Sequence, residues 1–370
     1  MSELKAAEVF PPGEILKDEL EERGWSQVEF AEIIGRDVSL VSDIIKGKRA
    51  ITPTVAKEIG AAFGQNPMHW MNMDAAYRLE QASEPPARIS GAAKVRARYP
   101  VRAMMNRGWI QKSESPEVVE TNLLKFFNIA SLDDLPTFKY AARKSSAPTN
   151  YEEITEVQRA WLFRVKQIAM TMVVRRAYSE DSLRNALPEL KKLMGEPEEI
   201  RHVPRILDEC GVRLVVVEPL PGSKVDGVCF WLDEISPVIG LSLTRDRIDN
   251  FWFNLRHEIE HVLARHAVFD SEIDPSDVSQ EESQANREAG EFCVPSEVMD
   301  DFIARKRPIF SERNIIGLAA RLGIHPGVVV GQLQRKIDRW NLLRKHQVRI
   351  REILTAAAMT DGYGHELQIG

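Results

Sequence analysis

The chain has 370 residues, enough for two or three domains that each bury their own core. Its composition, 44% hydrophobic and 28% charged, is ordinary for a soluble globular protein, and no apolar run reaches the roughly 18 to 20 residues of a membrane helix. The N-terminus lacks the apolar core of a signal peptide, and Cys210, Cys229 and Cys293 are too widely spaced for an evident disulfide framework. We therefore expect a cytoplasmic protein with no membrane partner.

The net charge of −6 argues against a protein that coats nucleic acid by bulk electrostatics, but the charge is unevenly spread. Residues 1–80 carry nine Lys and Arg against fourteen Asp and Glu, a balance of −5. Residues 81–112 carry Glu84 and seven basic residues, a balance of +6: Arg88, Lys94, Arg96, Arg98, Arg102, Arg107 and Lys112. Such a run is most often a solvated helix face or a linker, although it can also add phosphate contacts.

Helical signals follow a tail at residues 1–8 and predict an all-α domain over residues 9–83. Ser26 and Glu29 have the spacing of a capping box at the start of a helix that ends near Gly35. A second short helix follows a four-residue turn around this glycine. Together the two helices predict a helix-turn-helix, whose second helix can enter a DNA major groove.

Residues 12–81 resemble the DNA-binding domain of HigA-type antitoxins. The start P-G-E-I-L-K, the link G-K-R-A-I-T-P and the ending N-P-x-x-W-x-N carry this resemblance. It implies operator DNA as a partner, with bases facing Val38, Ser39 and Asp43. It also implies that phosphates are held by Gln27, Lys46, Lys48 and Arg49.

Asp43 is an unusual residue for such a surface. A carboxylate can accept a hydrogen bond from cytosine N4, but it repels phosphate, and the domain is net acidic. Two interpretations therefore stay open: DNA binding, or a helix-turn-helix used only for protein contacts or dimerisation. A homodimer is expected by analogy with other helix-turn-helix proteins.

Glu84-Pro85-Pro86 marks a linker, and residues 84–200 are predicted to be a helical region that spaces or buttresses the two ends. One long helix is expected over residues 151–178. No pattern in this region indicates chemistry.

Beyond residue 201 the pattern changes to β-branched runs. Residues 211–217, 228–232 and 238–243 predict three strands of a small, mostly antiparallel sheet. A helix is expected over residues 250–266, and further helices over 315–322 and 327–335. These last two repeat the spacing of the first helix-turn-helix, but we favour a helical cap on the C-terminal domain.

We place that domain at residues 201–345 and expect a C-terminal helix and tail over residues 346–370. The predicted fold class is α+β and mostly helical.

The segment His257-Glu258-Ile259-Glu260-His261 has the pattern H-E-x-x-H. Residues i and i+4 lie on one face of a helix, so His257 and His261 can bind one Zn²⁺ ion through their imidazoles. Glu258 follows the first of them and can serve as general base toward water without binding the metal. The alternative is two exposed histidines on a charged helix.

A zinc site needs a third protein ligand. We favour Glu282, because Asn286 follows it one helical turn later and can hydrogen-bond a ligand histidine. Glu281 and Glu288 are the competing carboxylates. His266 is interpreted as a packing residue or a support for the ligands, because a fourth protein ligand would close the site to water.

The flanking residues strengthen this interpretation. Asp226-Gly227, the H-E-x-x-H helix, and the pattern E-x-x-A-N leading to Val294-Pro295 resemble the ImmA/IrrE family of metallo-endopeptidases over roughly residues 200–335. The resemblance implies a zincin-like domain with one zinc per chain, bound by His257, His261 and Glu282, and with Glu258 as catalytic base. Glu288-Ala289 replaces the phenylalanine-alanine usual in that family.

The two resemblances together predict a DNA-binding transcriptional regulator or antitoxin with a zinc-dependent endopeptidase domain. Its substrate would be a regulatory protein, either a repressor or a partner in a toxin–antitoxin module. Residues 228–232 are a candidate sheet edge for a peptide substrate.

The alternative is a HigA-like antitoxin or repressor whose peptidase-like domain senses or binds a protein with little catalysis. A phosphate- or nucleotide-processing hydrolase is disfavoured, because the sequence has no glycine-rich phosphate loop.

Overall fold

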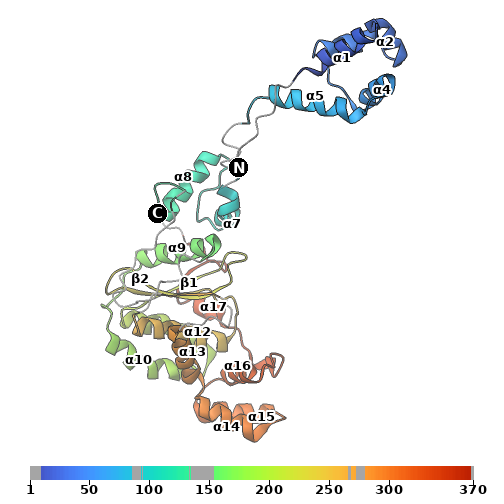
Figure 1. Ribbon diagram of the computed structural model, residues 1–370. Coiled ribbons are helices and arrows are strands. Elements are labelled where there is room, and N and C mark those ends of the chain that lie inside the picture. Colours follow the sequence, from blue (N-terminus) through green and yellow to red (C-terminus); the bar gives the residue numbers. More distant parts are fainter. Residues whose placement is uncertain are drawn as a thin grey trace. The chain divides into compact units, whose positions relative to one another are not determined.

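The computed structural model describes residues 10–85, 93, 95–132, 134, 154–265, 268–271 and 280–367. The chain forms two compact units, Met1–Ile89 and Ser90–Gly370, and each is described by itself. Figure 1 shows the helices and strands of both units.

The N-terminal unit is all-α, as predicted. Its helices are α1 (Pro12–Glu22), α2 (Gln27–Ile33), α3 (Val38–Ile45), α4 (Pro53–Phe63) and α5 (Pro67–Gln81). They enclose a core in which Leu16, Phe30, Ile59 and Trp70 are fully buried. The rings of Phe30 and Phe63 stack with centroids 5.0 Å apart, which fixes α2 against α4.

The predicted capping box is confirmed. The Ser26 hydroxyl accepts a hydrogen bond from the Glu29 backbone N–H at 3.2 Å, and the Glu29 carboxylate accepts one from the Ser26 N–H at 2.7 Å. After α2 the chain turns through Gly35, whose φ of 65° lies in the left-handed region that glycine adopts without strain. The helix-turn-helix is therefore formed by α2 and α3.

The second unit is built around a five-stranded sheet in the order β4-β2-β3-β1-β5. Its strands are β1 (Arg213–Val217), β2 (Val225–Trp231), β3 (Pro237–Leu241), β4 (Val268–Ser271) and β5 (Met359–Asp361). β1 is parallel to β3 and to β5, whereas β2 is antiparallel to β3 and to β4. The α+β, mostly helical fold class is confirmed.

Two predictions about this sheet are corrected. The sheet is mixed and not mostly antiparallel. Strand β3 lies between β2 and β1 and is parallel to β1, and β5 forms a second parallel pair with β1. The segment proposed as a sheet edge, 228–232, is internal, because β2 pairs with β3 on one side and with β4 on the other. Strands β4 and β5 have four and three residues, too few for a periodic signal in the sequence.

Helices cover both faces of the sheet (Figure 1). Alternate residues of β1 enter two separate cores: Val215 and Val217 face one, and Leu214 and Val216 face the other. The first core contains α7 (Val101–Asn106), α8 (Pro116–Phe127) and α9 (Glu156–Thr171). The second contains α10 (Glu180–Leu193), η2 (Pro197–His202), α11 (Val203–Glu209) and α12 (Ile248–Leu263).

Residues 84–200 therefore do not merely space the two ends. Their helices complete the cores on both sides of the sheet, with the fully buried Trp161 of α9 on one face and Leu190 of α10 on the other. The helix expected over residues 151–178 is shorter and runs from Glu156 to Thr171.

The remaining elements complete the second core. They are α13 (Gln280–Cys293), α14 (Ser296–Lys306), α15 (Glu312–Leu322), α16 (Pro326–Ile337), η3 (Arg344–His346) and α17 (Arg351–Thr355). Helix α16 packs against α12, α13 and α15, and buries Val328, Val329 and Leu333. The pair α15 and α16 thus caps the C-terminal unit, which is the interpretation that the sequence favoured.

Among the described helices, none is by itself both long and apolar enough to cross a membrane. The bent pair α15 and α16, at 114°, meets that criterion jointly, by length and composition only.

A buried ion pair holds β5 in the sheet. The Arg164 Nε of α9 donates to Asp361 Oδ2 at 2.7 Å, and the Trp109 Nε1 donates to the same oxygen at 2.7 Å. The two charged side chains are only 4% and 3% exposed. The predicted C-terminal helix and tail thus contains a short helix and a strand that is tied to the first core.

We expect Asp361→Ala to destabilise the C-terminal unit. It leaves the Arg164 guanidinium buried without its counter-charge, and breaking such a pair costs about 3–5 kcal/mol. Urea unfolding of the full chain measures the loss. The control is Asp301→Ala, which removes an exposed partner of Arg305 and should cost less than about 1 kcal/mol. Equal losses in the two variants would contradict a stabilising role for the buried pair.

Candidate metal centre

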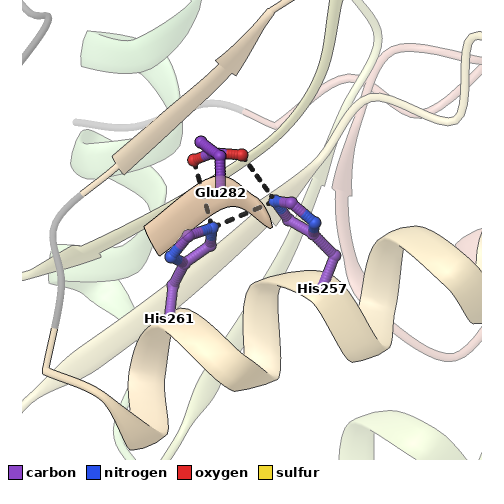
Figure 2. A group of neighbouring side chains, drawn as sticks. All are labelled: His257, His261 and Glu282. Carbon is purple, nitrogen blue, oxygen red and sulfur yellow. Dashed lines mark hydrogen bonds and ion pairs between the residues drawn. The ribbon is translucent and has the colours of Figure 1, made fainter. Parts of the chain in front are cut away.

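The two histidines of the motif lie on the inward face of α12. Their Nε2 atoms are 3.0 Å apart, and both side chains are buried, at 2% and 0% exposure. Figure 2 shows the two rings turned toward the same point. The alternative of two exposed histidines on a charged helix therefore does not describe this site.

Glu282 approaches the same point from α13. One carboxylate oxygen lies 3.3 Å from His257 Nε2, and the other lies 3.3 Å from His261 Nε2 (Figure 2). One donor atom from each of these residues lies within 4.8 Å of the others. Ligand atoms about 2.1 Å from a tetrahedral zinc ion lie roughly 3.4 Å from one another, so the observed separations of 3.0 and 3.3 Å are close to those around one such ion.

The charge state of Glu282 suits a metal ligand. Burial raises the pKa of its carboxyl, but hydrogen bonds and charges from His257 and His261 outweigh that effect and hold the pKa below its usual range. A deprotonated carboxylate is the form that binds metal.

The other candidates for the site lie elsewhere. Glu288 forms an ion pair with Arg256 at 3.6 Å, and Glu281 is not one of the three residues that converge. Asn286 is exposed on α13, so its support of a ligand histidine stays a prediction. His266 lies outside the described residues.

Glu258 lies on the sheet side of α12 and is 1% exposed. Its carboxylate rests on the backbone of β2 at Gly227: a Cβ atom there would lie 2.3 Å from Glu258 Oε1 and 3.0 Å from Cδ. Only glycine leaves room for this approach, which gives a physical reason for the Asp226-Gly227 pattern. Burial and the Glu258 charge raise the pKa of the neighbouring Cys229 thiol well above its usual value, so this thiol stays protonated.

Arg256 ties together the two helices that carry the donor atoms, a role that the sequence analysis missed. Its guanidinium contacts Glu260 of α12 at 2.8 Å and Glu288 of α13 at 3.6 Å, and its side chain is 6% exposed. Gln284 of α13 adds a hydrogen bond to Glu260 at 3.2 Å. Glu288, which stands where the ImmA/IrrE family usually has phenylalanine, is thus an ion-pair partner of Arg256. This unusual carboxylate was the signal in the sequence that could have pointed to Arg256.

In the N-terminal unit, most residues predicted to contact DNA are accessible. Val41 and Ile44 of α3 face the core, while the side chain of Asp43 is half-buried. Exposed side chains belong to Gln27, Val38, Ser39, Lys46, Lys48 and Arg49. The backbone N–H groups of Lys48 and Arg49 both donate to the Asp43 carbonyl, at 2.8 and 3.2 Å, which fixes the basic turn after α3.

The basic run at residues 81–112 is partly neutralised inside the second unit. Arg98 contacts Glu156 at 3.4 Å and the Leu132 carbonyl, and Arg107 pairs with Glu218. Arg88 and Lys94 of this run lie outside the described residues.

Two protein-family models match this chain. Residues 16–70 match the helix-turn-helix family, and residues 209–333 match the IrrE N-terminal-like domain. The second match contains the converging residues His257, His261 and Glu282.

Relatives resemble the N-terminal unit. The uncharacterized HTH-type transcriptional regulator YddM of Escherichia coli K12 is 33% identical over 73 residues, which make up 20% of this chain and 78% of that protein. Virulence-associated protein I of Dichelobacter nodosus is 34% identical over 74 residues, 20% of this chain and 68% of its own length.

Among solved structures, the Pseudomonas aeruginosa antitoxin HigA with higBA promoter is 32% identical and covers 20% of this chain and 82% of its own, with a TM-score of 0.20. The chain belongs to the helix-turn-helix family of transcriptional regulators through its N-terminal unit, and its C-terminal unit carries an IrrE-like domain of a peptidase family.

Proposed function

We propose that the protein is a DNA-binding regulator whose C-terminal unit is a zinc-dependent endopeptidase acting on a regulatory protein. The observation that carries the proposal is the convergence of His257, His261 and Glu282, with Glu258 buried beside them. Two neutral imidazoles and one carboxylate leave a fourth position open, which is the donor set of a catalytic zinc site. A bound Zn²⁺ ion would polarise the peptide carbonyl and make water acidic enough to attack it.

Glu258 supplies the proton transfer. It follows His257 directly on α12, so its side chain leaves the helix in a different direction from the two ligands and rests on Gly227. From there we expect it to take a proton from the attacking water and to deliver that proton to the leaving amine.

Metal content tests the ligand set. In protein purified without added zinc, we expect about one zinc per chain for wild type and for Glu258→Gln, since three protein ligands hold the ion and Glu258 is not one of them. Glu282→Ala should lose most of the metal. Mass spectrometry of the metal measures this, with Glu281→Ala as the matched control on the same helix. Full zinc retention in Glu282→Ala would remove that residue from the ligand set.

Gly227→Ala tests the position of the base. The added Cβ displaces the Glu258 carboxylate, so cleavage of a proteome-derived peptide mixture should fall by about 10²-fold or more, while zinc content stays unchanged. Gly317→Ala is the control, because a Cβ there meets no atom within 4 Å. Full activity in Gly227→Ala would show that catalysis does not need the observed position of Glu258.

DNA binding rests on the family of the N-terminal unit and on the exposed basic turn after α3. The competing interpretation is a domain that makes protein contacts only. It is supported by the net charge of −5 over residues 1–80, which disfavours binding to phosphates. The two differ in salt dependence, because each neutralised phosphate contributes about −0.9 to the slope of log K against log salt.

We therefore expect a DNA fragment from upstream of the protein's own gene to bind at low salt. Lys48→Gln should weaken binding and reduce the slope by about 1, because one phosphate contact is lost. Fluorescence anisotropy at two salt concentrations measures both. Lys57→Gln on α4 is the control and should leave the slope unchanged. Absence of wild-type binding at low salt would favour the protein-contact interpretation.

A further inference from the structure

The support beneath Glu258 includes a β-bulge in β2. Between Val225 and Gly227, β2 has one residue more than its partner β4, which places Asp226 at the bulge. A bulge interrupts the ladder locally and bends its strand, so the position of Gly227 depends on the contacts that hold this part of β2. Because the Glu258 carboxylate rests on Gly227, the position of the proposed base depends on the same contacts.

Two hydroxyl groups that follow β3 hold the bulge. The Ser242 hydroxyl donates to the Val225 carbonyl at 2.5 Å, and the Thr244 hydroxyl donates to the same oxygen at 3.3 Å. The Ser242 backbone N–H donates to the Asp226 carbonyl at 3.1 Å. Ser242 and Val225 are 0% and 1% exposed, so water does not replace these bonds. We call Ser242 and Thr244 the hydroxyl clamp.

The hydroxyl clamp depends on an unusual backbone turn at Leu243. The φ of this residue, 51°, lies in the left-handed region, which a leucine adopts only at a cost in free energy. The turn brings the hydroxyl oxygens of Ser242 and Thr244 within 2.9 Å of each other, and the Thr244 N–H donates to the Ser242 hydroxyl at 3.3 Å. Strain of this kind persists only where surrounding contacts fix the backbone.

The C-terminal segment supplies such contacts. The Tyr363 hydroxyl donates to the Ser242 carbonyl, and the Arg351 guanidinium donates to the Leu243 carbonyl at 2.8 Å. Arg351 also lies over the Tyr363 ring, with its Cζ 4.4 Å from the ring centre. The two side chains therefore support each other and the strained turn.

Tyr363 is itself fixed in place. Its backbone N–H donates to the Glu218 carboxylate at 2.7 Å, and that carboxylate pairs with Arg107. Burial raises the pKa of the Tyr363 hydroxyl to about 12, so the group stays protonated and remains a donor near neutral pH. A continuous series of contacts thus runs from Tyr363 through Ser242 and the β2 bulge to Glu258.

We propose that Ser242 and Tyr363 are positioning residues for the proposed base, because they fix the β2 bulge whose Gly227 supports the Glu258 carboxylate. They act through β2 and not on the substrate. Their loss should therefore slow proton transfer and leave the binding of substrate and metal intact. This inference rests on the proposed peptidase function and makes it depend on the C-terminal segment, far from the H-E-x-x-H motif in the sequence.

Steady-state kinetics tests the effect on catalysis. The probe is a synthetic peptide copied from a bond that wild type cleaves in the proteome-derived mixture. We expect Ser242→Ala and Tyr363→Phe each to lower kcat by about ten-fold, since each removes one hydrogen bond, and to leave KM and zinc content unchanged. Ser236→Ala is the matched control, because this hydroxyl donates to Asp233 at the other end of β3, and it should retain the wild-type kcat.

A second measurement does not depend on turnover. Cys229 lies in β2 close enough to Glu258 for that charge to act on its thiol, and Cys210 and Cys293 are buried elsewhere. We expect N-ethylmaleimide to modify Cys229 about ten-fold faster in Ser242→Ala and Tyr363→Phe than in wild type, because β2 opens locally more often. The rates for Cys210 and Cys293 should stay unchanged. Mass spectrometry of proteolytic peptides measures each cysteine separately.

The outcomes separate the positioning role from the peptidase. Unchanged kcat, unchanged labelling of Cys229, or equal acceleration at all three cysteines would overturn the positioning role and leave the peptidase standing. A higher KM at unchanged kcat would also overturn it, since the two residues would then act on substrate binding. Faster labelling of Cys229 alone, in a protein that cleaves no peptide, would support the positioning of Glu258 and overturn the peptidase.

Discussion

The contact between α12 and α13 is the interaction on which the proposed metal centre depends. Helix α12 presents two histidines spaced by one turn, and this pair alone offers only two ligand atoms. The third comes from α13, so the donor set exists only while the two helices keep their packing. The buried Arg256 guanidinium between Glu260 and Glu288 reinforces that packing close to the candidate ligands.

The opposite side of α12 serves a different purpose. Phe251, Trp252, Leu255 and Ile259 anchor the helix in the second core and fix its rotation. That rotation turns Glu258 onto Gly227 and the histidines toward α13. The geometry of one helix thus separates the proposed base, Glu258, from the two candidate ligand histidines. The sheet supports Glu258, and α13 supplies Glu282 as the third candidate ligand.

Local chemistry in the sequence was enough to predict much of this site. The i, i+4 spacing of His257 and His261 needs no tertiary information, and neither do the capping box at Ser26 or the turn at Gly35. Glu282 could be named from the spacing of E-x-x-A-N, and the structure places it against both histidines. What escaped prediction depends on pairing between distant segments: β4 and β5 have too few residues for a pattern, and Arg256 gains meaning only when Glu288 faces it. The position of β4 also explains why the expected sheet edge at 228–232 is internal.

Strand β5 has a consequence for the order in which the protein forms. Residues 1–89 make a unit with its own core, so this unit can fold while the rest of the chain is still being synthesised. The sheet of the C-terminal unit lacks its β5 pairing, and Arg164 lacks its counter-charge, until Asp361 has left the ribosome. The N-terminal unit can therefore fold before the C-terminal unit has its last strand and its buried ion pair.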